Sequence, residues 1–164
     1  MRRRHFITLF GGIVMAWPLA AYAQQAERVR RVGVLMPFAE NDTEAETRNV
    51  VFVQSLRQLG WTIGQDLQID YRWPGGNAAS IHRDAAELVA LAPDVLLAVG
   101  SSTTGPLQQA TQTIPIVFAN LADPVGAGFV QSLARPGGNT TGFTTYEYSM
   151  SGKWVECSSK SPRA

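Results

Sequence analysis

The sequence predicts an α/β domain built on a doubly wound parallel sheet with the strand order 2-1-3-4-5. Two short apolar runs, at 95–99 and 116–119, lack the polar alternation of a half-exposed strand and are typical of strands covered on both faces. Segments with helical spacing of apolar residues alternate with the strand-like runs, and the connections between them are short. This βαβ alternation favours right-handed crossovers, which place helices on both faces of one parallel sheet.

Five segments carry strand signals. The first apolar run stops at Pro37, the second alternates from Leu67, and Pro115 leads into the fourth. A turn at Pro136-Gly137-Gly138 precedes the fifth. We therefore expect strands at 32–36, 67–71, 95–99, 116–119 and about 140–143.

Four segments carry helix signals. Thr43 with Glu46 fits a capping box, Asn77 is a favourable N-cap after a Pro-Gly-Gly turn, and Pro106 suits the first turn of a helix. Gly60 ends the first of these segments. We expect helices at 43–59, from 77 to about 92, at 106–112 and, as a short piece, at 129–133.

The first 23 residues have the pattern of an export signal. Arg2, Arg3 and Arg4 precede an apolar core at 6–17, and Ala21-Tyr22-Ala23 fits a cleavage site. The apolar core is too short for a stable transmembrane helix. The start also fits a twin-arginine signal, so both export routes stay open. We expect a mature chain that begins at Gln24 and is released into the periplasm or outside the cell.

The composition limits the classes of protein to which the mature chain could belong. Without the signal, 11 basic residues face 13 acidic ones, and no basic stripe or internal repeat occurs, so nucleic acid is not expected as a partner. The length suits one domain with one core. Cys157 is the single cysteine, so the exported chain is expected to fold without an internal disulfide.

Small polar residues directly follow the third and fourth predicted strands. Ser101, Ser102, Thr103 and Thr104 lie where a helix is expected to begin, and free N–H groups and hydroxyls at such a position attract anions and carboxylates. Residues 120–123 would stand beside them, because open α/β sheets bind ligands outside the carboxyl ends of their strands. Ordinary helix capping by the hydroxyls is the alternative interpretation.

Seven motifs together carry a resemblance to a known family. They are the signal ending in Ala-Gln-Gln, Val32-Gly33-Val34-Leu35, Leu59-Gly60-Trp61, Asp94-Val95-Leu96, Ile114-Pro115-Ile116-Val117-Phe118, Asp123-Pro124-Val125-Gly126 and Arg135-Pro136-Gly137-Gly138-Asn139-Thr140-Thr141-Gly142. In this combination, residues 1 to about 156 resemble the substrate-binding proteins of ABC transporters with a type I periplasmic binding fold. The branch is the one related to tryptophan- and tyrosine-binding proteins.

The resemblance implies a two-lobed monomer that closes on a small solute and delivers it to an ABC permease in the inner membrane. It implies no cofactor and no covalent chemistry. Residues 24–150 would be the first lobe, which in this family contributes the loops after strands one and four and the helix start after strand three. The ligand-binding candidates that map onto these segments are Phe38, Asn41, Ser101, Ser102, Thr103, Asn120 and Asp123.

Structural roles remain open for several of these candidates. Phe38 could stack on an apolar part of the ligand or pack over the sheet edge. Residues 40–42 could form only a solvated loop and a helix cap. Asp123 could cap a short helix after Pro124, and Asn120 could be a turn residue. The solute itself is not named by the sequence, although hydroxyls at a helix start favour an amino acid or an organic acid.

An exported α/β hydrolase-like enzyme is the rival class, and the residue inventory disfavours it. His82 is the only histidine outside the signal, and no G-x-S-x-G elbow occurs. One histidine and one cysteine far apart do not form a zinc site, and no phosphate-binding glycine loop follows the first strand. We therefore expect a binding protein with no catalytic residues and no metal.

The last residues, 151–164, begin a helix that they do not continue. Helical apolar spacing starts at Gly152 and stops at Val155, and the following residues are polar. One permitted coding of the tail, read with a single base restored, gives Leu-Leu-Lys-Gln-Ile-Ala-Pro-Arg, which resembles what the family carries there. We expect a binding protein truncated by a frameshift, with one lobe and half of a ligand cleft.

Overall fold

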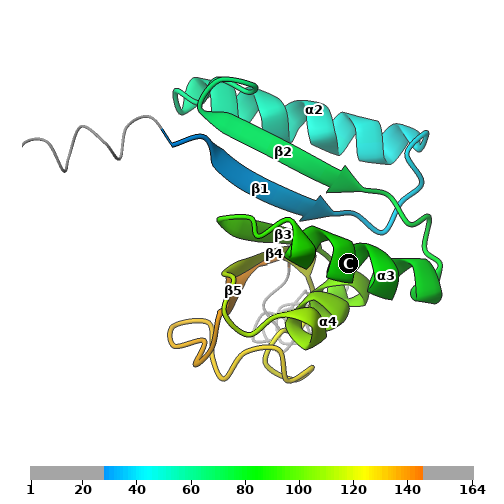
Figure 1. The fold of residues 1–164 in the computed structure, drawn as a ribbon. Helices are drawn as coiled ribbons and strands as arrows, with labels where there is room; N and C mark the ends of the chain where they lie inside the picture. The colour runs from blue at the N-terminus through cyan, green and yellow to red at the C-terminus, as the bar shows by residue number, and fades with distance from the viewer. Residues whose placement is uncertain (1–27, 146–164) are drawn as a thin grey trace, which may run out of the picture.

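The computed structural model describes residues 28–145, which form a parallel sheet of five strands with three helices around it (Figure 1). The strands are β1 (Arg30–Leu35), β2 (Leu67–Arg72), β3 (Val95–Val99), β4 (Ile116–Leu121) and β5 (Thr140–Thr144); the helices are α2 (Thr43–Gln58), α3 (Ala78–Ala90) and α4 (Ser101–Ala110). The sheet order is β2-β1-β3-β4-β5 and every pairing is parallel, which confirms the predicted order. The predicted signal and the predicted tail helix lie outside the described residues.

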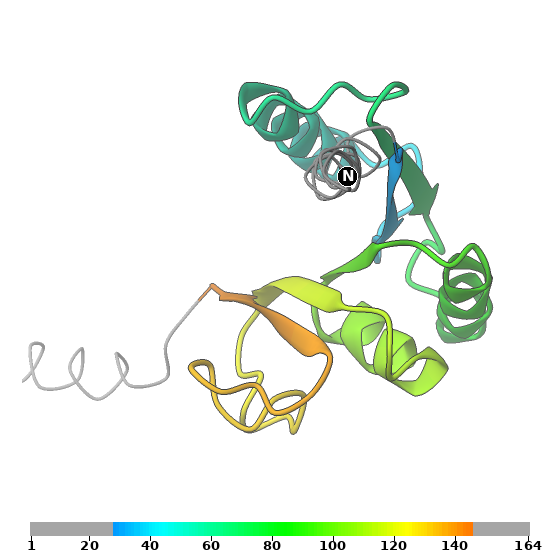
Figure 2. The same cartoon turned by 60° about the vertical axis from the view of Figure 1, so that its left-hand side comes forward.

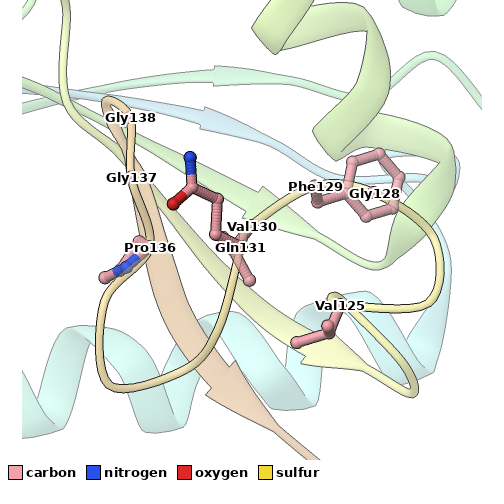
Figure 3. Close-up of a pocket in the computed structure, with 8 residues that line it drawn as sticks. All are labelled: Val125, Gly128, Phe129, Val130, Gln131, Pro136, Gly137 and Gly138. Carbon is pink, nitrogen blue, oxygen red and sulfur yellow. The ribbon is translucent and has the colours of Figure 1, made fainter.

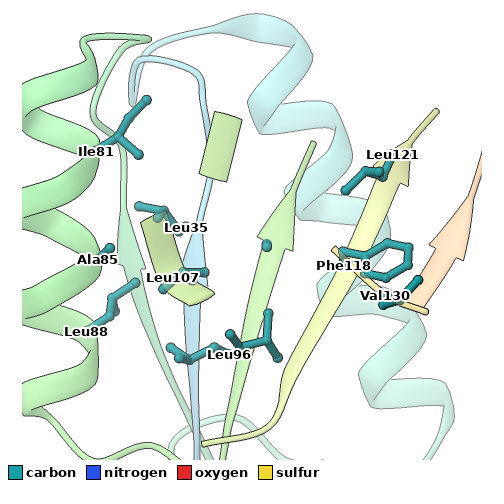
Figure 4. Packing of buried hydrophobic residues seen from close by; sticks show 11 residues of the cluster. Leu35, Ile81, Ala85, Leu88, Leu96, Leu107, Phe118, Leu121 and Val130 are labelled. Atoms are coloured by element: carbon teal, nitrogen blue, oxygen red, sulfur yellow. The ribbon is translucent and has the colours of Figure 1, made fainter. Parts of the chain in front are cut away.

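The larger core lies on the face of the sheet that α3 and α4 cover. Side chains at alternate positions of the strands point to this face, as the strand period of two requires. Figure 4 shows them beside Ile81, Ala85 and Leu88 of α3, with Leu107 of α4 nearby. The buried residues of this cluster are Leu35, Ile81, Ala85, Leu88, Leu96, Ala98, Leu107, Ile116, Phe118, Leu121 and Val130.

Helix α2 lies on the opposite face, over β1 and β2 (Figure 2). A smaller cluster of Val34, Met36 and Val99 is buried there, with Phe52 of α2 packed against it. Within residues 28–145 no helix covers the α2 side of β4 and β5, and Phe143 on that side is 77% exposed. The two faces of the sheet are therefore covered unequally in the described lobe.

Helix α4 begins five residues before the predicted start at Pro106. Pro106 lies inside the helix, where its ring nitrogen cannot donate to a carbonyl of the preceding turn. Thr103, Thr104 and Leu107 are nonetheless fully buried on one side of the helix. Burial of this stripe against the sheet outweighs the cost of the proline, and the prediction of the helix start was wrong for that reason.

The predicted helix at 129–133 is also wrong. The chain forms turns after Pro124, and the amides of Phe129 and Val130 both donate to the Pro124 carbonyl oxygen, at 2.9 and 3.2 Å. Gly128 takes a left-handed conformation with φ of 75°, which glycine adopts without steric cost. The turn brings Val130 into the core. An irregular segment, and not the expected helix, therefore covers the core at this position.

The start of α2 differs from the expected capping box. Asp42, rather than Thr43, is the N-cap, and its Oδ1 accepts hydrogen bonds from the amides of Glu44 (2.8 Å) and Ala45 (3.2 Å). The cap of α3 is as predicted, because Asn77 Oδ1 accepts from the Ser80 amide at 3.1 Å. Asp42 therefore has the helix-capping role that the sequence had left open.

Asp94 joins the starts of β1 and β3 at the amino end of the sheet. Its Oδ2 accepts from the Arg31 amide at 2.8 Å, and its Oδ1 lies 3.3 Å from Arg30 Nη1 and 3.4 Å from Arg28 Nη2. The hydrogen bond from the Arg31 amide and the two nearby guanidinium groups lower the pKa of the Asp94 carboxyl. The charged form of Asp94 therefore stabilises the folded state.

Replacing Asp94 with asparagine should lower the free energy of unfolding at neutral pH by about 1 kcal/mol, because charge-assisted hydrogen bonds are lost. Since folding lowers the pKa of Asp94, its contribution is complete above the unfolded-state pKa and disappears as the pH falls below about 4. Urea unfolding of wild type and Asp94→Asn at pH 7 and pH 3 should show a smaller difference at pH 3 than at pH 7. Glu40→Gln, in the exposed loop after β1, is the control, and an equal difference at both pH values would contradict this account.

Gly142 allows β5 to pack closely against β4. A Cβ at this position would overlap the Phe118 carbonyl oxygen and lie 2.7 Å from the Phe118 ring. Gly142→Ala should therefore destabilise the lobe by about 1–3 kcal/mol through overpacking. Gly138→Ala is the matched control, because a methyl group added at Gly138 would have no heavy atom within 4 Å. Equal thermal unfolding midpoints for the two variants would show that β5 accommodates the methyl group.

Candidate ligand-binding site

The chain leaves the sheet toward opposite faces at the carboxyl ends of β1 and β3, which makes this position the topological switch point of the sheet. The two strands are hydrogen-bonded neighbours. The loop after β1 leads to α2 on one face, and the chain after β3 enters α4 on the other (Figure 2). Open α/β sheets bind ligands at such a switch point, because the two loops separate there and leave polar backbone groups accessible.

The start of α4 differs from the starts of the other two helices in its capping. Asp42 and Asn77 satisfy amides at the starts of α2 and α3, whereas the residue before α4 is Gly100 and no side chain caps this helix. Ser101 and Ser102 are exposed at this end. The first amides of α4 and two hydroxyl groups are therefore available to a ligand, and the positive end of the helix dipole favours an anionic group.

Thr103 and Thr104 lie on the buried side of the same helix start. Both side chains are fully buried. The Thr103 hydroxyl donates to the Val99 carbonyl oxygen at 2.9 Å, and the Thr104 hydroxyl donates to the Gly100 carbonyl oxygen at 2.8 Å. These bonds attach α4 to the end of β3, so the threonines support the helix start from below while the serines face outward.

Asn120 lies inside β4, not after it as the sequence analysis expected. The β4–β5 register shifts between Phe118 and Leu121, and Asn120 takes a left-handed conformation with φ of 56°. Its Oδ1 accepts from the Thr145 hydroxyl at 2.7 Å. The Gly100 amide donates to the Ala119 carbonyl oxygen at 2.9 Å, so the irregular end of β4 lies directly beside the start of α4.

Asp123 stabilises the turn that follows β4. Its Oδ1 accepts from the Gly126 amide at 2.7 Å, and its carbonyl oxygen accepts from the Ala127 amide at 3.1 Å. The capping role that the sequence left open is therefore present, although the capped segment is a turn and not a helix. The second carboxylate oxygen remains the group through which Asp123 could bind a ligand.

The loop after β1 lies on the other side of the switch point. Phe38 is half-buried and packs against the cluster of Val34, Met36 and Val99, so the sheet-edge packing that the sequence left open is present. Its carbonyl oxygen accepts from the Gly75 amide at 3.1 Å, which joins this loop to the loop after β2. Asn41, nearer the tip of the loop, is exposed.

Two side chains near this loop were not singled out from the sequence. The Arg48 guanidinium carbon lies 5.3 Å from the centroid of the Phe38 ring. Trp73 stacks on Tyr71 with ring centroids 5.5 Å apart and an interplanar angle of 13°. Arg48 gave no local signal because only the helical phase of α2 brings it over a residue ten positions earlier. Trp73 directly follows β2, which could have marked it as a strand-end residue.

A separate hollow of about 420 Å³ lies along the β4–β5 connection (Figure 3). Val125, Phe129, Val130 and Pro136 supply its apolar wall, with Gln131 as a polar side chain, and it is open to solvent. Its lining residues are not those predicted for the site. No titratable side chain lines this hollow, so it offers no acid, base or metal ligand.

The described residues include neither a metal-binding cluster nor a helix able to cross a membrane. Within residues 28–145 no three histidine, cysteine or acidic side chains cluster as a metal site would require. His82 is exposed on α3. In the same region, no helix has both the length and the hydropathy needed to cross a bilayer.

Comparisons with known proteins agree with this architecture. A tyrosine-binding protein of Clostridioides difficile (strain R20291) is 30% identical over 95 residues, which cover 58% of this chain and 28% of that protein. A conserved domain protein of Vibrio cholerae superimposes with a TM-score of 0.67 at 32% identity, covering 79% of this chain and 43% of the other. An ABC domain from Streptococcus pneumoniae in complex with L-Trp gives a TM-score of 0.65 at 26% identity, covering 71% and 39%.

These likenesses confirm the type I periplasmic binding fold that the sequence resemblance implied. The chain spans less than half the length of each of these relatives. Residues 31–159 match the family model described as ABC transporter substrate binding protein. Because that match covers most of the chain, the protein belongs to the ABC transporter substrate-binding protein family.

Proposed function

We propose that residues 24–150 form the ligand-binding lobe of the solute-binding component of an ABC importer. The observation that carries the proposal is the uncapped start of α4, with exposed Ser101 and Ser102, at the switch point between β1 and β3. Membership in the substrate-binding family supports the transport role. The chain would be exported and would serve a permease in the inner membrane.

The proposed polar contacts come from two neighbouring strand ends. Ser101 and Ser102 would donate hydroxyl and backbone hydrogen bonds, and Asn120 beside them would orient the ligand through its amide. Asn120 holds a left-handed backbone that asparagine adopts at a modest cost, and such outliers often occur at binding sites. Asp123 would contribute its second carboxylate oxygen. Thr103 would act indirectly, by holding the helix start in place.

An amino acid or an organic acid is the favoured class of solute. A carboxylate fits the free amides and the dipole of α4, and an ammonium group fits oxygen acceptors such as Asn120 and Asp123. The ring of Phe38 offers an apolar surface on the opposite side, with Asn41 nearby in the same loop. The tyrosine-binding and L-Trp-bound relatives support an aromatic amino acid in particular.

Transport by such a protein requires binding without covalent chemistry. A ligand held between two lobes favours the closed state by the difference between its affinities for the closed and open states. Residues 28–145 supply one side of such a cleft. A ligand bound to one side alone keeps much of its surface in water, so we expect residues 28–145 by themselves to bind the solute weakly.

Amide NMR spectra of the exported chain, titrated with L-tryptophan, test the proposal. The amides of Ser101, Ser102 and Asn120 should shift with a dissociation constant in the millimolar range, and D-glucose should produce no shifts. The Ser101→Ala and Ser102→Ala variants should each weaken binding about threefold to tenfold, because each loses one hydrogen bond to a charged group.

Ser55→Ala is the matched control, since Ser55 is an exposed helical serine near the far end of α2. It should bind as the wild type does. Shifts confined to the hollow at residues 125–138 would place the site elsewhere, and no shift with any amino acid would contradict the proposed function. Binding at micromolar affinity or tighter would contradict the expectation that one lobe binds weakly.

A further inference from the structure

Arg48 places a positive charge over the loop after β1, at the switch point of the sheet. It lies in the second turn of α2, with its guanidinium carbon 5.3 Å from the centroid of the Phe38 ring. Phe38 packs in turn on a cluster that includes Val99, which is two residues before Ser101. Arg48 and Phe38 therefore lie beside the cluster that includes the last residue of β3, the strand that leads into the uncapped start of α4.

The other ion-paired arginines of the described region pair with acidic side chains away from the loop after β1. Arg28 and Arg30 pair with Asp94 at the amino end of the sheet, and Arg31 pairs with Asp70. Arg72 and Arg83 pair with acidic residues of α3. Among these ion-paired arginines, Arg48 is therefore the one that contacts a candidate ligand residue.

Arg48 can leave its ion-pair partner on α2 at little cost in free energy. Arg48 pairs with Glu44 one turn earlier on α2, and the two side chains are 37% and 60% exposed. Exposed pairs of this spacing contribute little to stability. The Phe38 ring beneath is held by its packing and by the bond from the Gly75 amide to its carbonyl oxygen. The guanidinium can therefore turn to a new partner while remaining over a fixed aromatic surface.

The charges around Arg48 are acidic and would repel an anionic ligand, so the positive charge of Arg48 matters for binding such a ligand. Glu40, Asp42, Glu44 and Glu46 lie in or just after the loop that follows β1. A carboxylate approaching the switch point meets this acidic segment, and a nearby cation is needed to offset the repulsion. Arg48 lies within that segment's own helix and can form two parallel hydrogen bonds to a carboxylate.

We propose that Arg48 binds the carboxylate of the solute, exchanging Glu44 for the ligand while its guanidinium stays over Phe38. One carboxylate oxygen would then accept from Arg48, and the other from the amides and hydroxyls at the start of α4. The inference rests on the proposed function and adds a contact residue to the same site.

The test compares two ligands that differ only in the carboxylate, L-tryptophan and tryptamine, by NMR titration of the exported chain. Arg48→Gln should weaken L-tryptophan binding about tenfold and leave tryptamine binding unchanged or slightly stronger. Arg48→Lys should give an intermediate loss, because lysine keeps the charge without the planar fork. Glu44→Gln should strengthen L-tryptophan binding about twofold to threefold, because it releases Arg48 from its partner.

Arg57→Gln is the matched control, since Arg57 is in the last turn of the same helix, near the opposite edge of the sheet. It should bind both ligands as the wild type does, and the amide spectra report whether each variant remains folded. If Arg48→Gln weakens both ligands equally, or neither, the assignment of Arg48 is wrong while the proposed function stands. If the wild type binds no amino acid, both proposals are wrong.

Discussion

The central position of β1 is the constraint on which the rest of the lobe depends. β1 pairs with β2 on one side and with β3 on the other, with Val34 opposite both Tyr71 and Leu97. Since both pairings are parallel, each connection must cross a face of the sheet, and the chain uses opposite faces before and after β2. The loops after β1 and β3 therefore leave the sheet toward opposite faces, and this switch point follows directly from the strand order.

The strands could be predicted from the sequence because the apolar residues that are buried in each strand lie within that strand's own segment. The observed β3 and β4 contain the runs at 95–99 and 116–119, and their alternate residues are buried against α3 and α4. The expected cover on both faces is not present for β4, whose α2 side no helix of residues 28–145 covers. The errors arose where tertiary packing overrides local preference. Burial of Thr103, Thr104 and Leu107 extends α4 ahead of Pro106, and Val130 reaches the core from turns instead of a helix. Neither outcome has a signal within its own segment.

The same division applies to the site. Topology alone places Ser101 and Asn120 at neighbouring strand ends, and the bond from the Gly100 amide to the Ala119 carbonyl oxygen confirms that proximity. The orientation of individual side chains depends on contacts that a sequence does not display. Thr103 follows two exposed serines yet is fully buried, and Arg48 lies over Phe38 only because α2 crosses back above the loop that precedes it.

The start of α4 and the uncovered side of β4 and β5 differ in their chemistry. The start of α4 offers its first amides and the exposed hydroxyls of Ser101 and Ser102, and the bonds of Thr103 and Thr104 to backbone carbonyl oxygens hold this helix start in place, so a small polar solute would meet amide donors that need little reorganisation. The α2 side of β4 and β5 offers Val117, Ala119 and Phe143, and a solute would gain only apolar contact there. A carboxylate must recover the hydrogen bonds that it loses on leaving water. Under the proposed function, selectivity for a charged solute would arise at the carboxyl ends of β1 and β3, where the donors of α4 lie on one face of the sheet and Arg48 of α2 lies on the other.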